Sequence, residues 1–359
     1  MIVALRRRKP MKARTASFRK LMASAALAAA ASAILLLAAS CAGGPSKAEP
    51  AAAAAPAPPY IARTINLKSE RVASGKIPEG GNLSLQVLLP ASYDSEPDRR
   101  YPVVYCLHGY GDPPSELISA AKPALRALWP GKKAMEFIMV GIPGTNSLGG
   151  SFYVDSPATG GWRSMITDEV VPLVDSSLRT RADRLSRAIA GFSMGGFGAW
   201  SLGLARPDLF AHAWACCPGA FAPGGLDAAL GQWDVSFCRA YGAAFAPDLS
   251  LERPYTDAPS AGKGSDPLYK AWYSGFGDIE GKLAAYEAGK ARLQSLRFDF
   301  GEADSYAWIP AGTKYVAAAM KSAGLPVEIR GWPGLGHNPA SEMIEEGLLP
   351  FLEKAFAPK

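Results

Sequence analysis

The chain contains only three histidines and five cysteines among its 359 residues, and charged side chains make up 19% of it. No spacing among the cysteines and histidines is typical of a zinc or other metal site, so we expect neither a metal nor a cofactor. No internal repeat is visible, which excludes repeat architectures such as solenoids. A reaction that needs an imidazole must therefore use His108, His212 or His337.

Acidic residues are absent from the first 40 positions, which hold eight of the 38 basic residues. Without these eight, 30 basic residues stand against 32 acidic ones, so the rest of the chain is close to neutral. The formal net charge of +6 thus comes from the N-terminus. Because no basic patch is left to follow a phosphate backbone, we expect no nucleic-acid partner.

An apolar, alanine-rich segment at 21–39 follows these basic residues, which is the layout of a secretory signal peptide. The alternative is an uncleaved membrane-spanning helix, since the segment is 19 residues long. The end of this segment and the next two residues, 37–41, read Leu-Ala-Ala-Ser-Cys. This sequence resembles a bacterial lipoprotein box, with Cys41 as the lipidated residue. We therefore predict a signal peptide at 1–40, an Ala/Pro-rich tether at 41–59 and an exported protein that is lipid-anchored to the bacterial cell envelope.

A single folded domain is expected at 60–359, and its length is enough to bury a full core. Hydrophobic residues make up 48% of the chain. Short apolar runs that are typical of buried strands alternate with helical stretches. This alternation favours an α/β fold, in which helices cover both faces of a mostly parallel sheet.

The segment 191–196 is Gly-Phe-Ser-Met-Gly-Gly and contains a G-x-S-x-G motif. An apolar run at 187–192 predicts a buried strand before the serine, and residues 194–205 predict a helix after it. This arrangement is typical of a nucleophile elbow, in which glycines let the backbones pass closely and leave the serine hydroxyl exposed. We predict that Ser193 is a nucleophile; the alternative is a simple glycine-rich turn.

The expected base for this serine is His337. In α/β-hydrolases the chain order is serine, carboxylate, histidine, and His337 lies in a glycine-rich loop at 334–338 after a predicted strand. His108 precedes the serine, and His212 lies in an alternating apolar segment, where a structural role is expected. The alternative for His337 is an ordinary histidine of a surface loop.

Three carboxylates precede this histidine in and after a strand near residue 300: Asp299, Glu302 and Asp304. A carboxylate on the loop beyond Gly301 is placed to orient the imidazole, so we choose Asp304 as the acid, with Glu302 in reserve. Asp299 is expected to face the sheet edge or to satisfy backbone groups.

Acyl transfer also needs hydrogen-bond donors for the developing oxyanion. The first expected donor is the backbone N–H of Met194, directly after the serine. The second is the N–H of Tyr110, in the loop after a predicted strand at 102–107. His108 is expected to shape that loop.

Four segments, standing in the same order along the chain, resemble the bacterial carboxylesterase family that includes feruloyl esterases, esterase D and the mycolyltransferases. They are 87–94, 101–105 with the following His108-Gly109, 168–175 and 191–196. The resemblance implies an α/β-hydrolase fold with an insertion or cap between the strands after the nucleophile. It also implies a serine hydrolase that cleaves small-molecule carboxylic esters through an acyl-enzyme, among them feruloyl-type or acetyl and acyl esters of carbohydrates.

The family's functional residues map onto positions singled out above. Its nucleophile, acid and base map onto Ser193, Asp304 and His337. Its oxyanion donors map onto Tyr110 and Met194. Two alternatives remain: an acyltransferase of the mycolyltransferase type, and a catalytically silent surface lipoprotein that binds ligands.

The insertion is expected between Cys217 and Leu296, where the ten aromatic residues from Trp233 to Tyr286 could line a cap over the serine or pack the insertion onto the body. Tyr153 and Trp162 are further candidates for the pocket wall. A disulfide from Cys238 to Cys216 or Cys217 is compatible with an exported protein, and the sequence leaves its pairing open.

Overall fold

The computed structural model describes residues 59–131 and 135–357. The predicted signal peptide, Cys41 and nearly all of the tether lie outside these residues. Within the described ranges, no helix combines the length and the apolar character that crossing a bilayer requires.

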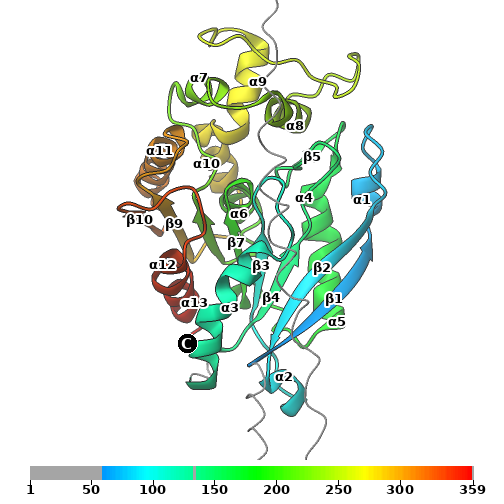
Figure 1. Ribbon diagram of the computed structural model, residues 1–359, viewed down its shortest axis with the longest axis vertical. Coiled ribbons are helices and arrows are strands. Elements are labelled where there is room, and N and C mark those ends of the chain that lie inside the picture. The colour runs from blue at the N-terminus through cyan, green and yellow to red at the C-terminus, as the bar shows by residue number, and fades with distance from the viewer. Residues whose placement is uncertain (1–58, 132–134, 358–359) are drawn as a thin grey trace, which may run out of the picture. The chain divides into compact units, whose positions relative to one another are not determined.

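An eight-stranded sheet forms the centre of the domain, in the order β1-β2-β4-β3-β7-β8-β9-β10 (Figure 1). The first two strand pairs are antiparallel and the remaining five are parallel, which confirms the predicted mostly parallel sheet. The strands are β1 (Tyr60–Lys68), β2 (Asn82–Pro90), β3 (Val103–Leu107), β4 (Ile138–Ile142), β7 (Arg187–Phe192), β8 (His212–Cys216), β9 (Ser295–Gly301) and β10 (Val327–Trp332), with β5 (Asp155–Ser156) and β6 (Gly160–Gly161) as a separate ribbon.

Helices surround this sheet (Figure 1). They are α1 (Glu70–Ala73), α2 (Ser92–Ser95), α3 (Glu116–Leu128), α4 (Trp162–Ser164), α5 (Val171–Ser177), α6 (Met194–Ala205), α7 (Gly225–Leu230), α8 (Val235–Phe245), α9 (Pro267–Phe276), α10 (Ile279–Ala288), α11 (Trp308–Ser322), α12 (Ser341–Met343) and α13 (Leu349–Phe356). Short 3-10 turns occur at Trp129–Gly131 and Arg184–Ser186, and π-helical turns at Met165–Val170 and Ile344–Leu348.

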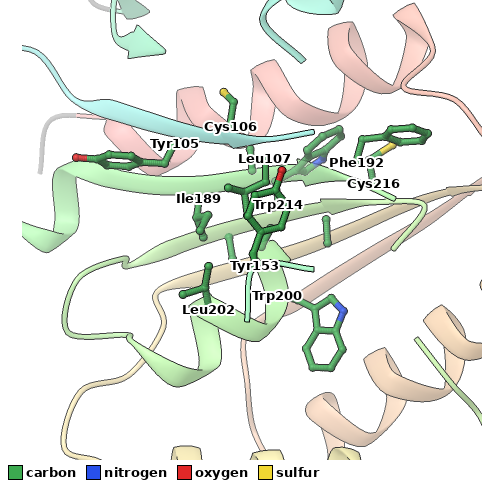
Figure 2. Close-up of a cluster of buried hydrophobic side chains, with 14 of the residues drawn as sticks. Tyr105, Cys106, Leu107, Tyr153, Ile189, Phe192, Trp200, Leu202, Trp214 and Cys216 are labelled. Atoms are coloured by element: carbon green, nitrogen blue, oxygen red, sulfur yellow. The ribbon is translucent and has the colours of Figure 1, made fainter. Parts of the chain in front are cut away.

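The central strands are buried along their whole length, because helices cover both of their faces. Every residue of β3, β4, β7 and β8 is buried, which explains why these strands are nearly continuous apolar runs in the sequence. Figure 2 shows the core at this place, where Ile189 and Trp214 of the sheet lie with Trp200 and Leu202 of α6. The predicted strand 187–192 and helix 194–205 are confirmed as β7 and α6.

The insertion between β8 and β9 forms the helices α7, α8, α9 and α10. Figure 1 shows α7, α8 and α9 together beyond one end of the sheet strands. Ring contacts hold this layer to the body of the domain: Phe276 of α9 packs against Phe197 of α6 at 4.9 Å between ring centroids, and Phe245 of α8 packs against the same ring at 5.5 Å.

Asp299 is fully buried in β9, and its role differs from the one expected from the sequence. Its carboxylate accepts hydrogen bonds from Nε1 of Trp214 in β8 (2.7 Å), Nε1 of Trp332 in β10 (2.8 Å) and Nε of Arg297 (2.7 Å). The side chain therefore lies inside the sheet and bonds to side chains, because two indoles on the neighbouring strands need a buried acceptor. It ties β8, β9 and β10 together.

Replacing Asp299 by Ala should destabilise the domain by about 3–5 kcal/mol, since the partly buried Arg297 guanidinium and two buried indole N–H groups lose an acceptor. Chemical denaturation followed by tryptophan fluorescence measures this change. Glu302→Ala is the matched control, because Glu302 is exposed, and its effect should stay within about 0.5 kcal/mol. Equal stability of D299A and wild type would contradict this role for Asp299.

Candidate active site

Ser193 occupies a strained turn between β7 and α6. Its backbone has φ 54° and ψ −113°, a conformation that non-glycine residues rarely adopt. The turn requires glycines on both sides: a Cβ on Gly191 would lie 2.0 Å from the carbonyl oxygen of Gly195, and one on Gly195 would lie 2.1 Å from that of Leu107. The local sequence thus allows a close backbone approach that presents the serine hydroxyl at the end of the strand.

The three residues expected to act on one another lie in hydrogen-bond contact. Nε2 of His337 is 2.9 Å from Oγ of Ser193, and Nδ1 of His337 is 2.7 Å from Oδ2 of Asp304. The Asp304 side chain is completely buried, and its other oxygen accepts the N–H of Tyr306 at 2.8 Å. Because a carboxylate can only accept, the Nδ1 proton of neutral His337 points to Asp304, and Nε2 is left to accept the Ser193 hydroxyl proton.

The other candidates from the sequence lie elsewhere. Glu302 is exposed, and Asp299 accepts hydrogen bonds from side chains of β8, β9 and β10, as described above. His108 is buried, and its Nε2 accepts the N–H of Gly144 at 2.8 Å, which anchors the loop after β3. His212 bonds the Ser295 hydroxyl at 2.8 Å, so its role is structural.

Both expected oxyanion donors border the cavity that holds Ser193. The N–H of Met194 lies in the first turn of α6, where helical N–H groups have no partner within the helix. The loop that carries Tyr110 is held from two sides: the Tyr110 hydroxyl donates to the Leu148 carbonyl at 2.6 Å, and the N–H of Gly109 donates to Oε2 of Glu116 at 2.8 Å. Burial raises the pKa of Glu116 to about 7.

The cavity has a volume of about 500 Å³. Trp233, Phe237 and Phe276 of the insertion line it, together with Tyr306 and Trp308 from the loop and helix after β9. The predicted cap is therefore present.

Other aromatic residues of the insertion pack it onto the body. Tyr241 and Trp272 are fully buried and lie outside the cavity lining. The expectation that Tyr153 and Trp162 form the pocket wall is wrong. The Tyr153 hydroxyl donates to the His108 carbonyl at 3.1 Å, and Trp162 Nε1 donates to the Thr159 carbonyl at 2.7 Å, so both rings are anchored inside the core.

Cys217 lies next to the same histidine, which no pattern in the sequence indicates. It directly follows β8 with φ 43°, and ligand atoms of Cys217, Asp304 and His337 lie within 4.8 Å of one another. Hydrogen bonds from Cys216 and His337 lower the pKa of Cys217 in spite of burial. Burial alone would lower the pKa of His337, but the bonds and charges of Asp304 and Cys217 outweigh it and raise that pKa to about 9.

The sequence is compatible with a disulfide from Cys238 to Cys216 or Cys217, and the structure contains neither bond. In the described part of the chain all four, Cys106, Cys216, Cys217 and Cys238, are free thiols.

Known proteins resemble part of this domain in sequence and the whole of it in fold. Residues 78–236 match the sequence family described as "Putative esterase". An endo-1,4-beta-xylanase/feruloyl esterase of Xylanibacter ruminicola is 32% identical over 120 residues, and an esterase of Mycobacterium tuberculosis is 34% identical over 122 residues. These matches cover 32% and 33% of this chain but 16% and 25% of the relatives' own length.

Two solved structures resemble the whole domain. A ferulic acid esterase has a TM-score of 0.57 at 22% identity, covering 83% of this chain and 99% of its own. An S-formylglutathione hydrolase from Agrobacterium tumefaciens has a TM-score of 0.56 at 17% identity, covering 84% and 96%. The protein is therefore an α/β-hydrolase in fold. In sequence, only the match of residues 78–236 to the esterase family model points to a family.

The contact between Cys217 and His337 predicts an unusual titration. The ring protons of His337, followed by NMR, should titrate with a midpoint near pH 9, because Asp304 and Cys217 stabilise the protonated ring up to higher pH than usual. Cys217→Ser should lower this midpoint, since a hydroxyl carries no negative charge. Cys238→Ser is the control and should leave it unchanged. A midpoint near the ordinary value of about 6.5 in all three proteins would contradict the contact.

Proposed function

We propose that this protein is a serine carboxylic ester hydrolase. The observation that carries the proposal is the continuous hydrogen-bonded line from Asp304 through His337 to Ser193, at the wall of a cavity large enough for a small ester. The esterase-family match and the α/β-hydrolase fold support the same activity.

The reaction uses each group of this line in turn. His337 Nε2 accepts the Ser193 proton while Oγ attacks the ester carbonyl, and the N–H groups of Tyr110 and Met194 stabilise the oxyanion. The intermediate then expels the alcohol, whose oxygen takes the proton from Nε2, and an acyl-enzyme remains. Water attacks this ester in the same way, the acid leaves, and Ser193 regains its proton.

Asp304 keeps the imidazole in the tautomer that the reaction needs and stabilises the imidazolium that forms. The neutral ring is the active form. Because the pKa of His337 is raised to about 9, the fraction of neutral ring, and with it the rate, grows as the pH rises toward that value.

The cavity supports a finer proposal about the acyl group. Trp233, Phe237, Phe276 and Trp308 line the cavity together with Ser193. Such a wall favours flat aromatic or apolar acyl groups, because aromatic pairs gain about 0.5–1.5 kcal/mol beyond their buried area. We therefore infer that feruloyl-type esters are substrates, alongside acetyl or acyl esters of carbohydrates.

We also propose that the protein is exported and lipid-anchored to a bacterial cell envelope through Cys41. The basic N-terminal segment, the apolar run after it and the Leu-Ala-Ala-Ser-Cys sequence support this proposal. In this arrangement, residues 41–59 would be the tether between the lipid and the folded domain.

Ser193→Ala should reduce the hydrolysis of p-nitrophenyl and feruloyl esters by about a millionfold, because a hydrogen-bonded serine, histidine and carboxylate act as a unit in catalysis. Asp304→Asn should have a severe but smaller effect. Glu302→Gln is the matched control, since this carboxylate is exposed two residues away. Activity that survives in S193A, or a larger loss in E302Q than in D304N, would overturn the assignment.

Cys41→Ala should move the protein from the membrane fraction to the soluble fraction of cells that process lipoproteins, because the lipidated residue is lost. Fractionation followed by immunoblotting measures this distribution. Cys238→Ala should stay with the membrane. If C41A also stays there, the apolar segment at 21–39 is an uncleaved span.

A further inference from the structure

We propose that Cys217, Asp304 and His337 together form a binding site for a thiophilic divalent cation such as Zn²⁺, and that an ion bound there stops catalysis. One ligand atom from each residue, a thiol sulfur, a carboxylate oxygen and an imidazole nitrogen, lies within 4.8 Å of the other two. Thiolate, imidazole and carboxylate are the three donor types that zinc uses in proteins.

The topology explains why these three donors meet. Cys217 follows β8, Asp304 lies three residues after the end of β9, and His337 lies five residues after the end of β10. The three strands are parallel neighbours, so their carboxyl ends open at the same edge of the sheet. The segments that carry the donors therefore start from neighbouring strand ends of one sheet.

Backbone strain directs the thiol toward the pair. The φ of 43° at Cys217 is unfavourable for a residue with a side chain, and the conformation is held by a 2.8 Å hydrogen bond from its N–H to the Asp299 carbonyl. Its sulfur lies 4.0 Å from the carbonyl oxygen of Gly336, next to the histidine. Strained positions of this kind occur where a side chain must be aimed.

The three donor side chains are largely buried, so few water molecules compete with a metal ion for them. Cys217 and the Asp304 side chain are completely buried, while the His337 side chain is 16% exposed and borders the cavity. An ion therefore reaches the donors from the cavity side. Once bound, its thiolate and carboxylate ligands are shielded from competing water.

Metal binding would remove the catalytic base by changing the imidazole tautomer. Nδ1 is the nitrogen that faces Asp304, and Nε2 faces Ser193. When a metal binds Nδ1 and the Cys217 sulfur, the imidazole keeps its one proton on Nε2, and the Cys217–His337 pair releases one proton overall. No oxidation or reduction takes place. A ring that carries its proton on Nε2 cannot accept one from Ser193, and its bond to Asp304 is lost.

Loss of turnover rests on the proposed ester hydrolysis, but metal binding itself does not. Binding is measured with Cd²⁺ on the full chain, because a cadmium–thiolate bond gives an ultraviolet charge-transfer absorption. We expect one equivalent to bind, and Cys217→Ser to weaken binding by roughly a hundredfold or more, since changes around metal ligands already cost 10–100-fold.

Two matched variants locate the ion. Cys238→Ser removes another free thiol and should keep the absorption. Ser193→Ala should also keep it, because Ser193 lies on the opposite side of the imidazole ring. An unchanged absorption in C217S, or its loss in C238S instead, would overturn the site.

Activity provides the second readout. Zn²⁺ should inhibit ester hydrolysis by the wild type, a chelator should restore it, and C217S should resist inhibition relative to its own metal-free rate. Full Cd²⁺ occupancy with undiminished turnover would overturn the inhibition. If the wild type hydrolyses no ester at all, the proposed function fails, while the cadmium absorption still decides the metal site.

Discussion

Parallel pairing of β7, β8, β9 and β10 is the constraint on which the candidate site depends. Each of these strands delivers one reactive group just beyond its carboxyl end: Ser193, Cys217, Asp304 and His337. The buried Asp299 carboxylate clamps three of the four strands through two indoles and a guanidinium. The register of the sheet thus determines the distances in the site, because the segments that carry Cys217, Asp304 and His337 start from clamped strands and β7 is paired with the first of them.

The two strained backbone positions near the site have different origins. Ser193 is strained because the elbow must turn sharply between a buried strand and a buried helix, and glycines make room for that turn. Cys217 is strained without glycine neighbours on its N-terminal side, and its effect is to place sulfur next to His337. The same imidazole nitrogen that Asp304 orients for catalysis is therefore within reach of a metal, so reactivity and metal sensitivity share one pair of residues.

Most of the reactive groups could be predicted from local patterns. Ser193 carries a motif on a strand–turn–helix, and chain order selects His337 among only three histidines. The choice among Asp299, Glu302 and Asp304 was harder, because three carboxylates within six residues differ only in which way they face. Asp299 was interpreted wrongly, since its partners Trp214 and Trp332 are 85 and 33 residues away. The expectation that Tyr153 and Trp162 line the pocket was wrong for a similar reason, because the sequence around each ring does not show what the ring packs against.

The sequence by itself determined the fold class, the strand and helix around Ser193 and the order of the reacting residues, because these depend on local periodicity and on short glycine patterns. Only the tertiary structure decided which carboxylate faces the imidazole and which aromatic rings of the insertion line the cavity. It alone also shows that Cys217 lies beside Asp304 and His337. Those contacts join residues from separate strands, and sequence spacing carries no information about them until the sheet register brings the strand ends together.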